Sequence, residues 1–180
     1  MQVVSNSSPL IALSGIDCLH LLKAQFGIIH IPDAVLQELK LDSGFPGSEL
    51  IQNAIEEKWI QVQTVTDLNI VSLLKRDLDN GESEALSLAK TRNADLVLLD
   101  EKEARRFATT MELNSTGTIG IILKAYRKKE INDPMQLFHS LKKKVGFFIS
   151  KSMMLEIQKE TLAILKEFKE LGKRPKLPSK

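Results

Sequence analysis

The sequence of 180 residues contains a single cysteine, Cys18, so an internal disulfide bond is excluded. This cysteine usage is typical of a reducing compartment, and we expect a cytoplasmic protein. Histidine is also scarce: His20, His30 and His139 are scattered and do not have the spacing of a zinc site. Any metal ion bound by this chain would therefore be held by oxygen atoms.

Long apolar runs and aromatic residues are scarce as well. No apolar segment approaches the roughly 20 residues that a membrane-spanning helix needs, and the first residues lack the basic region of a signal peptide. We therefore expect no association with a membrane. Aromatic residues make up 5% of the chain, which argues against a platform that stacks nucleic-acid bases. The hydrophobic fraction of 43% and the charged fraction of 27% are typical of a globular protein.

The two ends of the chain differ in the sign of their charge. Residues 1–100 carry 7 basic and 14 acidic side chains, whereas residues 101–180 carry 18 basic and 9 acidic ones. A phosphodiester substrate bridged by a divalent cation would need both signs. Solvated helix surfaces that happen to differ in sign explain the asymmetry equally well.

Strands and helices are expected to alternate along most of the chain. Apolar or β-rich runs predict strands at residues 3–6, 28–31, 59–65, 96–100 and 113–115, with helical patterns between them. This alternation predicts a three-layer α/β/α domain over residues 1–152, with a central and mostly parallel sheet. An amphipathic helix is expected at 153–172, followed by a basic tail at 173–180. We expect this helix to pack on the domain, with a partner or a second copy of the chain as the alternative.

The stretch from Leu78 to Asp100 gives the first indication of a site. The apolar run Leu96–Leu99 predicts a buried strand that stops at Asp100, and Glu82 is expected to open the preceding helix. Helices of βαβ units begin at the carboxyl edge of the sheet, where the parallel strands end and where open α/β sheets bind ligands. Asn6, after the first strand, and Glu38, in the helix after the second, are predicted to lie on the same edge.

Carboxylates gathered at one edge repel one another unless a cation is present. Mg²⁺ and Mn²⁺ prefer oxygen ligands, and a metal-bound water can hydrolyse a phosphodiester. We therefore predict that Asn6, Glu38, Glu82 and Asp100 are metal ligands and catalytic residues. Each also has a purely structural explanation: a favourable helix dipole for Glu82, a helix cap for Asp100, a helix surface for Glu38 and turn hydrogen bonds for Asn6. We expect the neighbouring Glu84, Glu101 and Glu103 to be solvated, and Ser8 either to orient Asn6 or to cap a helix.

Five segments together resemble a PIN domain, in the prokaryotic branch similar to VapC toxins of toxin–antitoxin pairs. They are VVSNSSPLIAL, IHIPDAVLQEL, LDNGESEALSLAK, ADLVLLDEKEARRFA and STGTIGIILKAYRKKEI, and the match runs from about Val3 to Met154. The resemblance implies a central parallel sheet between helices and Mg²⁺- or Mn²⁺-dependent RNA cleavage by an acidic cluster. It places the four acidic positions at Asn6, Glu38, Glu82 and Asp100.

Two of these positions depart from the family pattern. The first is usually Asp, so Asn6 removes one charge. We expect weaker metal binding and reduced activity, although an amide oxygen still coordinates hard cations. At the third, Glu82 is one methylene longer than the more common Asp. The Thr116–Thr118 segment, where some relatives have another acid, offers only hydroxyls.

The expected function is an endoribonuclease that acts as the toxin of a toxin–antitoxin pair, with an antitoxin protein as partner. The resemblance alone implies a homodimer. The backbone of the RNA would be bound by cations such as Lys102 and the run from Arg127 to Lys129, and the substrate-binding candidates are Ser8, Arg105, Arg106, Thr116 and Lys128. The alternatives are a catalytically weakened PIN fold that binds RNA or a protein, and a nuclease directed at DNA or at a particular nucleic-acid structure.

Overall fold

The computed structural model describes residues 1–170, and the predicted basic tail at 173–180 lies outside this range. The chain forms two compact units, Met1–Thr118 and Ile119–Lys180. The first unit contains the sheet and the predicted acidic residues, and the second contains the long C-terminal helix. Within residues 1–170, no helix combines the length and the apolar composition needed to cross a bilayer.

A five-stranded parallel sheet forms the centre of the first unit. Its strands are β1 (Val3–Ser5), β2 (Ile29–Pro32), β3 (Ile60–Gln63), β4 (Leu96–Leu98) and β5 (Ser115–Thr116). Their order in the sheet is β3-β2-β1-β4-β5, and all neighbouring pairs are parallel. β1 is therefore central: Val4 lies opposite His30 of β2 and Val97 of β4.

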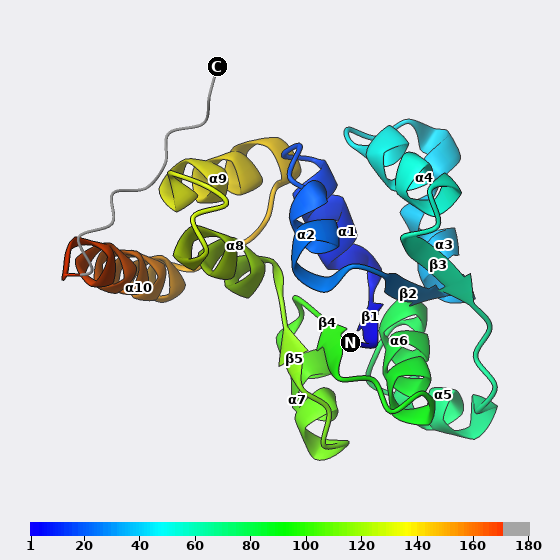
Figure 1. The fold of residues 1–180 in the computed structure, drawn as a ribbon. Helices are drawn as coiled ribbons and strands as arrows, with labels where there is room; N and C mark the ends of the chain where they lie inside the picture. The colour runs from blue at the N-terminus through cyan, green and yellow to red at the C-terminus, as the bar shows by residue number, and fades with distance from the viewer. Residues whose placement is uncertain (171–180) are drawn as a thin grey trace. The chain divides into compact units, whose positions relative to one another are not determined.

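Helices cover both faces of this sheet. In chain order they are α1 (Ser7–Ser14), α2 (His20–Phe26), α3 (Asp33–Leu39), α4 (Ser48–Glu56), α5 (Leu68–Leu74), α6 (Asn80–Thr91) and α7 (Lys102–Thr110), with a short 3₁₀ turn at Leu41–Ser43. Figure 1 shows α5 and α6 on one side of the sheet, and α1 and α2 on the other. The predicted three-layer α/β/α fold is confirmed.

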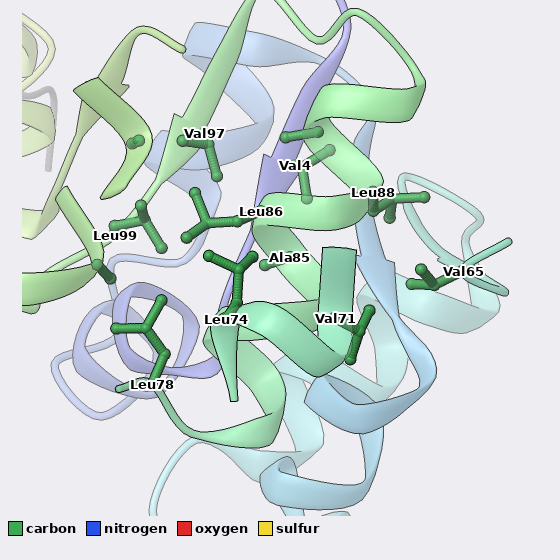
Figure 2. Packing of buried hydrophobic residues seen from close by; sticks show 13 residues of the cluster. Val4, Val65, Val71, Leu74, Leu78, Ala85, Leu86, Leu88, Val97 and Leu99 are labelled. Carbon is green, nitrogen blue, oxygen red and sulfur yellow. The ribbon is translucent and has the colours of Figure 1, made fainter. Parts of the chain in front are cut away.

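A buried apolar cluster joins one face of the sheet to its helices. Side chains alternate between the faces of a strand, so Val4, Val97 and Leu99 point to this cluster. Figure 2 shows Leu86 of α6 packed among these residues and Leu74 of α5. This packing fixes α6 against β1 and β4, and with it the position of the α6 N-terminus at the sheet edge.

The predicted start of one helix near the acidic residues was wrong, and one of the purely structural explanations does not apply. Helix α6 begins at Asn80 rather than at Glu82, because Asp79 is its N-cap and accepts a hydrogen bond from the Glu82 backbone N–H at 2.8 Å. The Glu82 side chain in turn accepts a hydrogen bond from the Asp79 N–H, which completes a capping box. Helix α7 begins at Lys102 with Glu101 as its N-cap, so Asp100 does not cap it.

The second unit contains α8 (Thr118–Arg127, which starts on the last residue of the first unit), α9 (Pro134–Ser140), a π-helical turn at Leu141–Val145 and α10 (Lys151–Glu170). The Phe168 ring of α10 packs edge-on against Tyr126 of α8, with ring centroids 5.6 Å apart, and Lys129 Nζ lies 4.6 Å from the same ring. The predicted amphipathic helix therefore packs on its own chain at this end. A role in binding a second copy stays a prediction.

We expect the substitution Leu86→Ala to destabilise the protein by about 2–5 kcal/mol, because it removes a fully buried side chain and leaves a cavity next to the sheet. Leu73→Ala in α5 is the matched control: this leucine is 59% exposed, so its loss should cost less than about 0.5 kcal/mol. Urea unfolding of both variants measures the difference. Equal losses would contradict the packing described above.

Candidate functional site

Asn6 lies directly after β1, at the carboxyl edge of the sheet. Its backbone N–H donates to the carbonyl of Leu98 at 3.1 Å, which ties it to the end of β4 two residues before Asp100. The side chain is buried, and its Oδ1 atom has no hydrogen-bond partner among the described residues. A buried carbonyl oxygen without a partner is uncommon and calls for a ligand or an ordered water.

Glu38 connects the N-termini of two helices at this edge. Its Oε2 accepts a hydrogen bond from Ser7 Oγ at 2.8 Å, and its Oε1 accepts one from the Gly81 N–H at 2.7 Å. Ser7 and Gly81 are the chain neighbours of Asn6 and Glu82, so the carboxylate of Glu38 is brought next to both. A Cβ atom on residue 81 would overlap the Glu38 carboxylate, so only glycine permits this approach.

Glu82 lies in the first turn of α6 and is buried. Its Oε1 has no hydrogen-bond partner within residues 1–170. The pKa of its carboxyl is raised to about 7, mainly by burial. The charges of Asp79, Glu101 and Glu38 contribute to this increase, and the hydrogen bond from the Asp79 backbone N–H partly opposes it. Near neutral pH, Glu82 is therefore poised between its neutral and its charged form.

Asp100 is held by the turn that leads into α8. Its Oδ1 accepts a hydrogen bond from the Thr118 N–H at 2.8 Å, and its Oδ2 accepts one from Thr118 Oγ1 at 2.6 Å. Arg105 places a guanidinium nitrogen 3.8 Å from Oδ1. Burial raises the pKa of Asp100, whereas the two hydrogen bonds from Thr118 and the charge of Arg105 lower it and only partly offset the effect of burial.

The four predicted residues therefore lie at the same edge of the sheet, although they do not form a closed cluster. Asn6, Glu38 and Glu82 are linked through their immediate neighbours, and the charge of Glu101 raises the pKa of both Glu82 and Asp100. Within residues 1–170, no three His, Cys, Asp or Glu side chains are already placed to hold a metal ion.

The chemistry of these side chains nevertheless fits a hard cation. All four offer oxygen, and two of the oxygens, Asn6 Oδ1 and Glu82 Oε1, are buried and unpaired within the described residues. The carboxylate oxygens of Glu38 and Asp100 accept hydrogen bonds but each keeps a second lone pair. A divalent ion would also favour the charged form of Glu82, whose pKa is raised mainly by burial and further by nearby carboxylates.

The comparison with known protein families agrees with this fold. A family model for a PIN domain matches residues 2–163, which is most of the chain. The protein belongs to the PIN-domain family. PIN domains are generally nucleases and typically use divalent metals, so this membership supports a hydrolytic nuclease. No protein of the curated set matches the chain.

The substrate-binding candidates of this PIN domain lie in different surroundings. Ser7, and not Ser8, is the serine that contacts Glu38. Arg106 pairs with Glu103, while Thr116 lies in β5 and accepts a hydrogen bond from Leu99 N–H through its backbone. Lys128 belongs to the second unit, where its Nζ lies 3.8 Å from Glu130. Substrate roles for Ser8, Arg106, Thr116 and Lys128 stay predictions.

Three contacts at the site were missed by sequence reasoning. Ser7 and Thr118 hold the carboxylates of Glu38 and Asp100, and Glu84, which we expected to be solvated, accepts a hydrogen bond from the Ala34 N–H at 3.0 Å. Glu38 of α3 thus accepts a hydrogen bond at the N-terminus of α6, and Glu84 of α6 accepts one at the N-terminus of α3. Carboxylates are favoured at helix N-termini, so each glutamate could have been expected to find one. The sequence does not show which helix this is, because Glu84 and Ala34 lie 50 residues apart in the chain.

We expect Glu82→Gln to change how stability depends on pH in the metal-free protein. The pKa of Glu82 is about 7 in the folded state, against an ordinary value of 4.5. Between these values the unfolded chain has released a proton that the folded protein retains, so wild-type stability should fall as the pH rises through this window. The glutamine variant should lack this fall. The free energy of unfolding of the variant minus that of wild type should therefore be larger at pH 8 than at pH 4.

Urea unfolding with a chelator, at pH 4 and at pH 8, measures this difference. Glu103→Gln is the control, because Glu103 is an exposed residue whose one ion pair within residues 1–170 is with Arg106 on its own helix. This variant should follow the wild-type pH dependence. A constant offset between wild type and Glu82→Gln at both pH values would show that burial does not perturb Glu82.

Proposed function

We propose that this PIN domain is a Mg²⁺- or Mn²⁺-dependent endoribonuclease whose catalytic residues are Asn6, Glu38, Glu82 and Asp100. The observation that carries the proposal is the meeting of these side chains at one sheet edge, with two buried oxygens left unpaired among the described residues. The resemblance to VapC-like sequences further supports a toxin that works in the cytoplasm as a homodimer and is bound by an antitoxin protein.

The protein itself supplies the orientation of the ligands. Ser7 and Gly81 fix Glu38 between α1 and α6, and Thr118 fixes Asp100 after β4. Asn6 offers a neutral oxygen and Glu82 an oxygen whose proton is lost easily near neutral pH. When bound, a divalent ion activates a water molecule and offsets the charge of the phosphodiester.

RNA is the substrate class that the resemblance to VapC-like sequences implies, and the composition is compatible with it. Aromatic residues are too few for a base-stacking platform, and the region after residue 100 is rich in Lys and Arg. Recognition through the phosphate backbone and the shape of the RNA follows from these two features. DNA oligonucleotides of the same sequence are the comparison that separates a ribonuclease from a nuclease of broader range.

Asn6 favours a second candidate function, a PIN fold that binds RNA or a partner protein but cleaves slowly. The asparagine leaves one charge fewer at the edge than the usual Asp, which weakens the attraction for a divalent cation. The two candidates differ in a single measurable property. The first predicts turnover of RNA, and the second predicts binding without turnover.

We expect Asp100→Ala to lower the rate of RNA cleavage in Mn²⁺ by about 100-fold or more, because it removes a ligand and leaves Thr118 without its acceptor. Asn6→Asp should raise the rate, since it restores a negative charge at the edge. Asp95→Ala is the matched control: Asp95 lies just before β4, at the opposite end of that strand, and accepts a hydrogen bond from the Gln2 N–H.

Gel-based cleavage of structured RNAs measures all three variants. The ribonuclease proposal requires activity in wild type that Asp95→Ala retains and Asp100→Ala loses. RNA binding without cleavage, in wild type and in Asn6→Asp alike, would favour the weakened PIN fold. Equal cleavage of matched DNA would replace the ribonuclease with a general nuclease.

We also expect Mn²⁺ to stabilise the folded protein, by about 2.7 kcal/mol at a concentration one hundred times its dissociation constant. Glu82→Gln should reduce the increase in melting temperature, because it replaces an ionisable ligand, whereas Asp95→Asn should retain it. Thermal unfolding in MnCl₂ and in EDTA measures the effect. The same increase in Glu82→Gln and wild type would place the ion elsewhere.

A further inference from the structure

Arg105 is the cation closest to the site among the sequence candidates of the first unit, and its side chain is anchored. Its Nε donates a hydrogen bond to the Leu99 carbonyl at 2.8 Å, directly beside Asp100. A terminal nitrogen lies 3.8 Å from Asp100 Oδ1, which is an ion-pair distance but too long for a hydrogen bond. The guanidinium is therefore fixed at one end and directed to the acidic edge.

Gly117 makes room for this arrangement. A Cβ atom on residue 117 would overlap the Arg105 terminal nitrogen and would also crowd Asp100 Oδ1 and the Leu99 carbonyl. The backbone of residue 117 and the guanidinium thus lie in direct contact. Because residue 117 has no side chain, the Arg105 guanidinium can lie beside Asp100.

The terminal nitrogens of Arg105 have donors to spare. Both oxygens of Asp100 already accept hydrogen bonds from Thr118, and within residues 1–170 the guanidinium donates only through Nε. The Arg105 side chain is 39% exposed, so a ligand from solution can reach it. Guanidinium donors in a fixed plane match the oxygens of a phosphate group better than those of most other ligands.

The next residue along α7 has a different environment. Arg106 is 68% exposed, pairs with Glu103 one turn away on the same helix, and lies 5.5 Å from the Phe107 ring. No contact of Arg106 with the acidic edge exists in the described part of the chain. The sequence alone treats Arg105 and Arg106 as equivalent cations, and the structure separates them.

We propose that Arg105 is the residue that binds a phosphate of the RNA backbone beside the acidic edge. It would do so through the terminal nitrogens, which make no hydrogen bond among the described residues, while Nε stays bound to the Leu99 carbonyl. This inference rests on the proposed ribonuclease function and names the group that recognises the substrate. One cation held at Asp100 also offsets the repulsion between the acidic edge and a negatively charged strand.

Binding of a labelled single-stranded RNA, measured by fluorescence anisotropy in EDTA between 50 and 200 mM salt, tests this role without metal or turnover. Arg105→Gln removes the charge and keeps a side-chain amide donor for Leu99. It should weaken binding and reduce the slope of log K against log salt by about 0.7, the value of one lost phosphate contact. Arg105→Lys should keep the slope and bind less tightly than wild type, because it loses the planar fork.

Arg106→Gln is the matched control. It should change the slope of log K against log salt by less than half of the change caused by Arg105→Gln. A wild-type slope in Arg105→Gln, an equal loss in Arg106→Gln, or no RNA binding by wild type would each overturn the proposal. Thermal unfolding checks that the variants are folded, and if Arg105→Gln is not, reduced affinity of folded Arg105→Lys decides the matter. RNA binding that depends on Arg105, without cleavage by wild type, would support this inference while the ribonuclease proposal failed.

Discussion

The cost of burying carboxylates at one sheet edge is the constraint on which the proposed site of this PIN domain depends. Glu38, Glu82 and Asp100 reach one sheet edge, where burial raises the pKa of Glu82 and of Asp100 and so disfavours their charged forms. The protein compensates two of them with hydrogen bonds: Ser7 and Gly81 donate to Glu38, and Thr118 donates twice to Asp100. Glu82 receives less compensation, and its pKa of about 7 records the remaining imbalance.

The same contacts connect the site to the fold. The hydrogen bond of Glu38 to Gly81 and that of Glu84 to Ala34 join α3 and α6 in both directions, and α6 is itself packed on β1 and β4 by the buried cluster. Substitutions in this cluster would therefore move the acidic edge as well as reduce stability. Gly81 and Gly117 have a common function, since each lets a charged side chain lie against backbone.

Asn6 is the residue that distinguishes the two proposed functions. It directly follows β1, the central strand, and its buried amide oxygen has no hydrogen-bond partner among the described residues. A neutral ligand there lowers the repulsion that the metal-free fold must tolerate. It also lowers the attraction for a divalent cation at the site that we propose.

The sequence by itself determined the layered fold and the edge at which the acidic residues meet. Both follow from local patterns, because the alternation of strands and helices sets the architecture and chain direction places every strand end of a parallel sheet on one side. The contacts within that edge were decided only by the tertiary structure. Three such contacts depend on the direction of a side chain or on a partner that folding brings from a distant segment. They are the contact of Ser7 rather than Ser8 with Glu38, the hydrogen bond from Ala34 to Glu84, and the contact of Arg105 rather than Arg106 with the acidic edge. Such partners leave no periodic signal in the chain.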